Sequence, residues 1–290
     1  KPDGVASNNF SHGNPTGGAI EVNENEKEQT DDSADIKEEN TEEEIKERQV
    51  DNVIAQDEIS KENKIQELEQ DNKQEEIDKK MYPDEIAGVK RGKPKTFEQM
   101  MQQGVNPKYM SDEDEYGEYS KNCQSCTVAA ELVIRGYDVE AGPYSTPEAK
   151  ELGNNGETAY IDSKTGEKCV RDIIFTNEVD CNDYLEQNVK QGERYELIYN
   201  TPTESGDKIF DLKNENRGHS VLITRGENGK LLYYDPQEYK TLEGNDAKKY
   251  ISTWFQYEKT IVSPPRILRI DDKALNLKYV NKVVKKRNKS

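Results

Sequence analysis

The sequence has 290 residues, of which 31% are hydrophobic, and its formal net charge is −18 at pH 7. That charge argues against nucleic-acid binding, which needs Lys and Arg side chains to neutralise phosphates. No run of about 18 apolar residues occurs, so we expect no transmembrane helix and no insertion into a membrane.

The first 80 residues carry most of the excess charge, with 24 acidic and 10 basic side chains. Phe10 is their only aromatic residue. Such a segment cannot bury enough apolar surface to offset the entropy lost when a chain becomes ordered. We therefore predict a disordered acidic tail over residues 1–80, in which residues 41–81 form at most a solvated charged helix. Residues 81–117, with several Pro and Gly, predict a linker.

The pattern over residues 118–290 is typical of one folded domain. A helix is expected to begin at Cys123 or Cys126 and to end at Arg135, because Gly136 can adopt the left-handed conformation that terminates helices. The other predicted elements are strands within ETAYIDSK (157–164), LIYNT (197–201), GHSVLITR (218–225), KLLYYDPQ (230–237) and SPPRILRID (263–271), and a helix within EGNDAKKYISTWFQY (243–257). One helix followed mainly by antiparallel strands indicates an α+β fold.

Any imidazole chemistry in the folded part depends on one residue. The sequence has two histidines, and His12 lies in the predicted tail, so the imidazole must come from His219. His219 begins a predicted hairpin whose second strand ends in Asp235. A carboxylate beside the ring can accept the Nδ1 proton, fix the tautomer and stabilise the imidazolium. His219 and Asp235 are therefore a candidate base and its orienting residue.

The length of the hairpin loop decides whether these two side chains share a face of the sheet. A two-residue loop would point His219 to the face opposite that of Asp235. A three-residue loop over 227–229, with Gly229 in the left-handed conformation, would place Val221 opposite Asp235 and His219 diagonal to it on the same face. A Cys–His–Asp site therefore predicts the three-residue loop.

Two cysteines three residues apart occupy the start of the predicted helix, where unpaired N–H groups and the helix dipole lower the pKa of a thiol. Cys123 follows Asn122, a good N-cap, and is our first choice of nucleophile, with Cys126 second. A zinc site that combines both with Cys169 and Cys181 is an alternative. Simple packing or a disulfide between the latter two is another.

The run NCQSCTVAAELVIRGYDVEAGP, followed downstream by GHSVLITR and LLYYDPQ, resembles the papain-fold toxin family. These are papain-like cysteine domains at the C-termini of polymorphic bacterial toxins and of some phage minor head proteins. The resemblance covers about residues 122–237, with a weaker similarity of RGKPKTFEQ to phage head-protein linkers. It implies a papain-like fold with Cys123, His219 and Asp235 as a triad. CQSC is also similar to the CGSC of papain, whose second cysteine is the nucleophile, so Cys126 stays a candidate.

The sequence departs from the papain pattern at the oxyanion hole. The Gln that papain places six residues before its nucleophile has no counterpart here, because Gly117 and Ser120 stand at those positions. A backbone N–H at the helix start must then stabilise the oxyanion, with Asn122 or Gln124 as further candidates. Gln237, which would directly face the histidine in the three-residue-loop hairpin, is a second candidate to orient the imidazole.

The resemblance implies a thiol hydrolase that acts on amide bonds of a protein target, as a glutamine deamidase or a cysteine peptidase. The same chemistry with an amine in place of water would be a transglutaminase. We expect no cofactor, no metal, a protein substrate, and a virion-associated or delivered effector rather than a resident membrane protein. The alternative is a catalytically inactive structural or binding module of a phage minor head protein.

Overall fold

The computed structural model of the protein describes residues 42–112, 114, 116–174, 177–200, 218–255 and 265–288. The chain divides into two compact units, residues 1–61 and residues 62–290. The disordered tail predicted for residues 1–41 lies outside the described residues.

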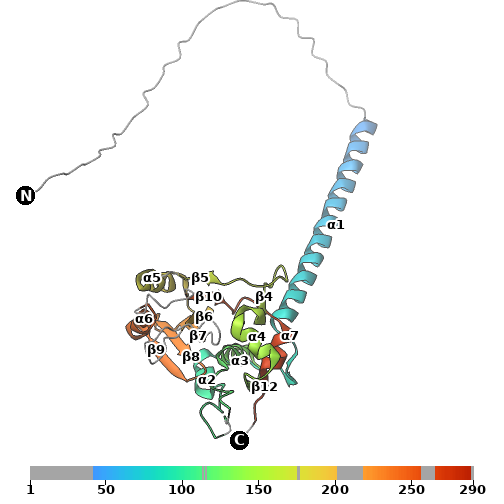
Figure 1. The fold of residues 1–290 in the computed structure, drawn as a ribbon. Coiled ribbons are helices and arrows are strands. Elements are labelled where there is room, and N and C mark those ends of the chain that lie inside the picture. The colour runs from blue at the N-terminus through green and yellow to red at the C-terminus, as the bar shows by residue number, and fades with distance from the viewer. Residues whose placement is uncertain are drawn as a thin grey trace, which may run out of the picture. The chain divides into compact units, whose positions relative to one another are not determined.

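Helix α1 (Glu42–Met81) is a continuous helix of 40 residues (Figure 1). Its side chains over residues 46–76 are exposed. Ion pairs four residues apart join Lys61 to Asp57 and Lys79 to Glu75 on its surface. Such solvent-exposed pairs stabilise a helix only weakly. The structure thus has a solvated charged helix over residues 42–81, which corrects the prediction of disorder for this part of the tail.

The core of residues 62–290 is a six-stranded antiparallel sheet in the order β5-β10-β6-β7-β8-β9. Its strands are β5 (Asp172–Ile173), β6 (Arg194–Asn200), β7 (Gly218–Arg225), β8 (Leu231–Asp235), β9 (Lys240–Glu243) and β10 (Arg266–Arg269). Four of them, β6, β7, β8 and β10, lie where the sequence predicts strands.

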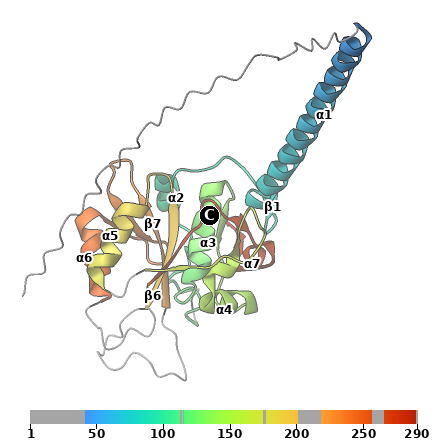
Figure 2. The same cartoon turned by 90° about the horizontal axis from the view of Figure 1, so that it is seen from above.

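Helices cover both faces of this sheet (Figure 2). Helices α5 (Glu178–Asn188) and α6 (Gly244–Thr253) share one core with Val221 of β7. Helix α3 (Cys123–Arg135) shares a second core, on the other face, with Leu222. Successive residues of β7 therefore serve different cores, as expected when side chains alternate along a strand.

Helix α3 is the central helix of the fold, and every residue from Gln124 to Arg135 is buried. Gly136 ends it in the left-handed conformation, at φ 108°, as predicted. A Cβ atom at Gly136 would lie only 2.6 Å from the carbonyl oxygen of Gly92. Glycine is therefore required there both for the backbone conformation and for the close approach of the chain before α2.

The predicted linker over 81–117 is wrong for much of its length. It contains β1 (Glu85–Ile86), β2 (Val89–Lys90) and α2 (Phe97–Gln103), and it buries Ile86, Val89, Met100 and Val105 in the core around α3. Backbone bonds from Gly92 N–H to Gly136 and from Lys95 N–H to Ile134 fasten it to the end of α3. Few apolar residues occur in this segment, but several of them are buried, which composition alone does not reveal.

Several short elements complete the fold. The predicted strand over 157–164 is a strand only at β4 (Tyr160–Ile161), which follows a 3₁₀ helix. Further elements that were not predicted from the sequence are β3 (Val139–Ala141), α4 (Pro147–Asn154), β11 (Ala274–Leu275), α7 (Leu277–Val283) and β12 (Val284–Lys286), in addition to β5, β9 and α5. Strand β3 pairs with β12 and β4 with β11, both antiparallel.

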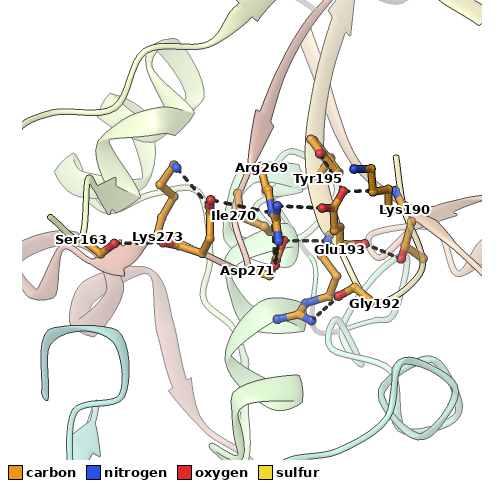
Figure 3. A network of polar contacts seen from close by, with 12 residues as sticks. Ser163, Lys190, Gly192, Glu193, Tyr195, Arg269, Ile270, Asp271 and Lys273 are labelled. Atoms are coloured by element: carbon orange, nitrogen blue, oxygen red, sulfur yellow. Dashed lines mark hydrogen bonds and ion pairs between the residues drawn. The ribbon is translucent and has the colours of Figure 1, made fainter. Parts of the chain in front are cut away.

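Polar contacts fasten the end of β10 to the turn before β6 (Figure 3). The Arg269 guanidinium lies 2.7 Å from Glu193 Oε1 and 2.9 Å from Asp271 Oδ2. Asp271 Oδ1 also accepts the backbone N–H of Arg194 at 2.8 Å. These contacts hold β6 and β10 in the register that pairs Arg269 with Tyr195.

The described residues therefore form an α+β fold with antiparallel sheets, as predicted. Within them, every helix is too short or too polar to cross a membrane.

Candidate active site

The hairpin of β7 and β8 has the three-residue loop that a Cys–His–Asp site requires. Leu222 pairs with Tyr234, a register that sets Val221 opposite Asp235. The loop closes with a bond from the backbone N–H of Gly226 to the carbonyl of Lys230. Gly229 has a φ of 74°, in the left-handed region. The three-residue loop is thus confirmed.

His219 and Asp235 lie in contact at the end of this hairpin. His219 Nε2 is 2.5 Å from Asp235 Oδ2. We expected the carboxylate to meet Nδ1, and the structure corrects this to Nε2, because the diagonal position of the two residues turns the far nitrogen of the ring toward the carboxylate. Nδ1 is thereby left as the ring nitrogen that can exchange a proton with another group.

The Asp235 carboxylate is itself held in place by the turn that follows β8. Its Oδ1 accepts the backbone N–H groups of Gln237 at 2.9 Å and Glu238 at 3.2 Å. Asp235 is 2% exposed. Its two oxygens therefore have separate partners, the turn on one side and His219 on the other, and the orientation of the imidazole follows from the turn.

Gln237 does not lie opposite His219, which corrects the prediction that it could orient the imidazole. Strand β8 ends at Asp235, and the chain turns there to pair Asp235 with Lys240 of β9. The side chain of Gln237 instead donates from Nε2 to Asn122 Oδ1 at 3.2 Å. Gln237 thus links the turn that holds Asp235 to the start of α3.

Cys123 is the first residue of α3 and is partly exposed. Burial by itself would lower the pKa of His219, but hydrogen bonds to Asp235 and Cys123, and the negative charges of these two groups, raise it well above its ordinary value. The imidazole therefore interacts with the carboxylate and with the thiol. The structure brings Cys123, His219 and Asp235 together in that order.

The start of α3 also offers unpaired N–H groups. The first backbone bond of the helix runs from Cys126 N–H to the Asn122 carbonyl at 3.0 Å. The first N–H groups of an α-helix, here those of Cys123 and Gln124, have no carbonyl partner within the helix. They can stabilise a negative oxygen beside Cys123.

The Asn122 side chain is fully engaged and makes no cap bond to the helix. Its Oδ1 accepts from Asn106 Nδ2, Gln237 Nε2 and Cys126 Sγ, each at 3.2 Å. Its Nδ2 donates to the Gly142 carbonyl at 2.9 Å and to Asn106 Oδ1 at 3.2 Å. Asn122 therefore ties the start of α3 to its surroundings, and its amide is not free to bind an oxyanion as we expected.

Cys126 lies one helical turn further on and is fully buried. Burial raises the pKa of its thiol well above the ordinary value, and the neighbouring Cys123 and Asp235 raise it further. Cys126 Sγ donates to Asn122 Oδ1, as a thiol and not a thiolate would. These surroundings favour Cys123 over Cys126 as the reactive cysteine.

Gln124 is also buried, and its carboxamide lies against Gly156. A Cβ atom at Gly156 would come within 2.2 Å of Gln124 Oε1, so only glycine leaves room for this side chain. Gln124 Oε1 has no hydrogen-bond partner among the described residues. The side chain therefore has an unused polar atom next to the nucleophile candidate.

The two remaining cysteines lie in different cores. Cys169 packs in the core that contains α3, and Cys181 in the core that contains α5 and α6. All four cysteines are free. A disulfide between Cys169 and Cys181, or a zinc site that gathers all four thiols, does not fit this arrangement, because the sheet separates the two cores.

Two residues near the site are not evident from the sequence pattern. Tyr199 of β6 is the direct cross-strand partner of His219, and the rings meet edge to face with centroids 5.7 Å apart. Tyr199 in turn stacks on Trp254 at 3.7 Å. The second is Glu196, a buried carboxylate in the same strand that faces the opposite side of the sheet and contacts Ser220. A charged residue inside the apolar run YELIYN was the available signal for it.

Comparison with known protein families and with curated protein sequences gave no match to this chain. What the site does must therefore be inferred from its own residues.

Proposed function

We propose that the protein is a papain-like thiol hydrolase that cleaves amide bonds of a protein target. Cys123 is the nucleophile and His219 is the general base and acid. Asp235 orients the imidazole and stabilises its protonated form. The observation that carries this proposal is the 2.5 Å contact between His219 and Asp235, on a ring that also interacts with Cys123. A papain-like fold is supported by a cysteine at the start of the central helix and a His–Asp pair on antiparallel strands.

The first step is proton transfer from Cys123 to His219. The raised pKa of His219 favours the imidazolium, and the charge of Asp235 stabilises it. Two backbone N–H groups hold the Asp235 carboxylate in place beside the imidazole. The resting site is thus a thiolate beside an imidazolium.

The thiolate then attacks the carbonyl carbon of the amide, and the carbonyl electron pair moves to oxygen. The backbone N–H groups of Cys123 and Gln124 stabilise that oxyanion. As the C–N bond breaks, His219 gives its proton to the departing nitrogen. The products of this step are a free amine or ammonia and a thioester on Cys123.

Water completes the cycle. Neutral His219 removes a proton from water, and the resulting hydroxide attacks the thioester carbon. The C–S bond breaks, the carboxylic acid product leaves, and the site returns to thiolate and imidazolium. If the attacked amide is a backbone bond the reaction is proteolysis, and if it is a Gln side chain the reaction is deamidation.

Labelling of the full chain with iodoacetamide tests the proposal. Rates are measured from about pH 4 to about pH 9, a range that spans ordinary histidine and cysteine pKa values, with mass spectrometry to resolve each cysteine. We expect fast labelling of Cys123 below neutral pH and loss of that reactivity in His219→Ala. Cys126→Ala is the matched control and should label at Cys123 like wild type.

The alternative, an inactive structural module of a phage minor head protein, gives a different result. Cys123 would then label slowly at neutral pH, with the pH dependence of an ordinary thiol, and His219→Ala would not change the rate. That outcome would contradict the enzyme proposal and leave the fold as a structural or binding module.

A further inference from the structure

A buried group of four polar side chains lies between α3 and the sheet. We call it the Glu196 cluster, and its members are Glu196 of β6, Thr127 of α3, Ser220 of β7 and Arg171. Glu196 Oε1 accepts the hydroxyl of Ser220 at 2.6 Å and lies 3.1 Å from Thr127 Oγ1, whose one proton is shared between this oxygen and the Gln124 carbonyl at 2.9 Å. Glu196 Oε2 accepts from Arg171 Nη2 at 2.8 Å. Both oxygens of the carboxylate therefore have partners.

The two hydroxyl groups belong to the elements that carry the proposed nucleophile and base. Thr127 lies four residues, about one helical turn, after Cys123. Ser220 directly follows His219, and points to the opposite face of β7. One carboxylate oxygen thus connects α3 to β7 at the positions next to the two reacting side chains.

Through Arg171, the cluster also contacts the segment that packs beside Gln124. Arg171 Nε donates to Glu157 Oε2 at 3.1 Å, and Arg171 Nη1 donates to the Glu196 carbonyl at 3.2 Å. Glu157 follows Gly156, the residue against which the Gln124 carboxamide packs. The same buried ions therefore also fix the segment that adjoins the first turn of α3.

Stability is a poor explanation for such a cluster. Burying a charge carries a desolvation penalty of several kcal/mol, and well-packed apolar side chains of similar volume often serve stability as well or better. Apolar contacts allow elements to slide past each other, whereas hydrogen bonds tolerate only small changes in distance and angle. The cluster is thus suited to fixing the position of α3 relative to β7.

We infer that Glu196 is a positioning residue that holds α3 and β7 at the spacing at which Cys123 meets His219. This inference rests on the proposed function. It assigns to Glu196 no contact with substrate, since the carboxylate is fully buried and acts through Thr127 and Ser220.

The chain offers a matched control for the test. Thr224 lies on β7 like Ser220, is buried like Thr127, and donates its hydroxyl to the Glu193 carbonyl at 2.6 Å. This hydroxyl bond does not involve Glu196. Thr224→Val therefore removes a buried, hydrogen-bonded threonine hydroxyl outside the cluster.

The experiment compares full-length wild type, Thr127→Val, Ser220→Ala, the double variant and Thr224→Val. It measures the rate of Cys123 alkylation against pH at a temperature well below unfolding, together with each melting temperature. We expect the double variant to lose about tenfold in rate below neutral pH, since small misplacements of reacting groups carry large rate penalties. Its profile should move toward that of an ordinary thiol. Thr127→Ser, which keeps the hydroxyl, should restore the wild-type profile.

Three results are distinguishable. A shifted profile in the cluster variants, with a wild-type profile in Thr224→Val, supports the inference. Cluster variants that melt lower but keep the wild-type profile overturn it and reduce Glu196 to a structural role. Wild type without fast labelling dependent on His219 overturns the proposed function first, and this inference with it. Because each single variant removes one hydroxyl only, the test stands even if the double variant fails to fold.

Discussion

His219 holds a proton in a largely buried place because two groups favour its charge. Its side chain is 13% exposed, and burial alone would favour the neutral ring. Asp235 and Cys123 outweigh that effect and raise the pKa of His219 well above its ordinary value. Asp235 can do so because the turn after β8 supplies its other oxygen with two N–H donors.

This raised pKa predicts how the stability of the fold depends on pH. Because the pKa of His219 is higher in the folded state, the stabilisation is fully present below the unfolded pKa and is lost as the pH rises through the folded pKa. We expect His219→Gln to lower the free energy of unfolding by about 1.5–3 kcal/mol at mildly acidic pH, the usual contribution of a charge-assisted hydrogen bond. Urea denaturation across pH measures it. A difference from wild type that stays constant up to strongly alkaline pH would contradict this assignment.

The two cysteines of the helix start should behave differently when each is replaced. Cys126→Ala removes a buried thiol and one hydrogen bond to Asn122, and should lower the free energy of unfolding by about 1 kcal/mol while hydrolysis continues. Cys123→Ala should abolish hydrolysis without a comparable loss of stability, because Cys123 is partly exposed. Activity assays and thermal melts on both variants check this. The reverse pattern would make Cys126 the nucleophile.

At the scale of elements, the hairpin that carries the site could be predicted because chemistry and geometry constrain each other. Only an odd loop places His219 and Asp235 on one face, and Gly229 is suited to the left-handed residue of that loop. Helix α3 was predictable for a similar reason, since Gly136 marks its end. Local sequence signals were thus sufficient to predict the β7–β8 hairpin and α3, the two elements that position the proposed triad.

Other parts of the site and fold could not be predicted, because long-range contacts decide them. The Glu196 cluster joins residues from 127 to 220, and no local pattern announces such a contact. The segment with Ile86 and Met100 has few apolar residues, and these two are buried only because they pack in one core with residues of the folded α3. By contrast, Thr146 and Pro147 form a recognisable helix start for α4, a signal that sequence analysis passed over.

The end of α3 and the hairpin loop give a comparative prediction about glycine. Gly229 and Gly136 both have positive φ, but a Cβ at Gly229 meets open space, whereas one at Gly136 meets the Gly92 carbonyl at 2.6 Å. Gly229→Ala should therefore lower stability only by the backbone cost, about 1–2 kcal/mol. Gly136→Ala should lower the stability by clearly more, because its Cβ would also clash with the Gly92 carbonyl. Thermal melts compare the two variants, and equal losses would show that the chain before α2 does not press on the end of α3.

At the scale of the whole molecule, charge and burial are unevenly shared between two units. The first 80 residues have a large acidic excess, while the buried cores lie entirely within residues 62–290. Helix α1 exposes even its apolar side chains, among them Val53 at 65% and Leu68 at 62%. Its helical structure therefore depends on local propensity and on ion pairs along its own surface, which are individually weak.

This division predicts where the chain can be shortened. Removal of residues 1–61 deletes no buried apolar side chain of either core, so the melting temperature and the labelling of Cys123 should match those of the full chain. Removal of residues 1–92 also deletes Ile86 and Val89, which are buried against α3, and takes away the bond from Gly92 to Gly136. Each buried aliphatic side chain is worth about 1.5–3 kcal/mol, so this second truncation should lose several kcal/mol of stability.

The comparison of these two truncations shows which residues before 92 are a dispensable tail and which belong to the folded unit. Differential scanning calorimetry gives the melting temperatures, and iodoacetamide labelling reports whether the pairing of Cys123 with His219 survives. If removal of residues 1–61 alone lowered the melting temperature as much as removal of residues 1–92, the unit of residues 1–61 would be stabilising the unit of residues 62–290 directly. If only the longer truncation does so, the boundary of the folded unit lies between residues 61 and 92, and that stretch belongs to the fold that packs against α3.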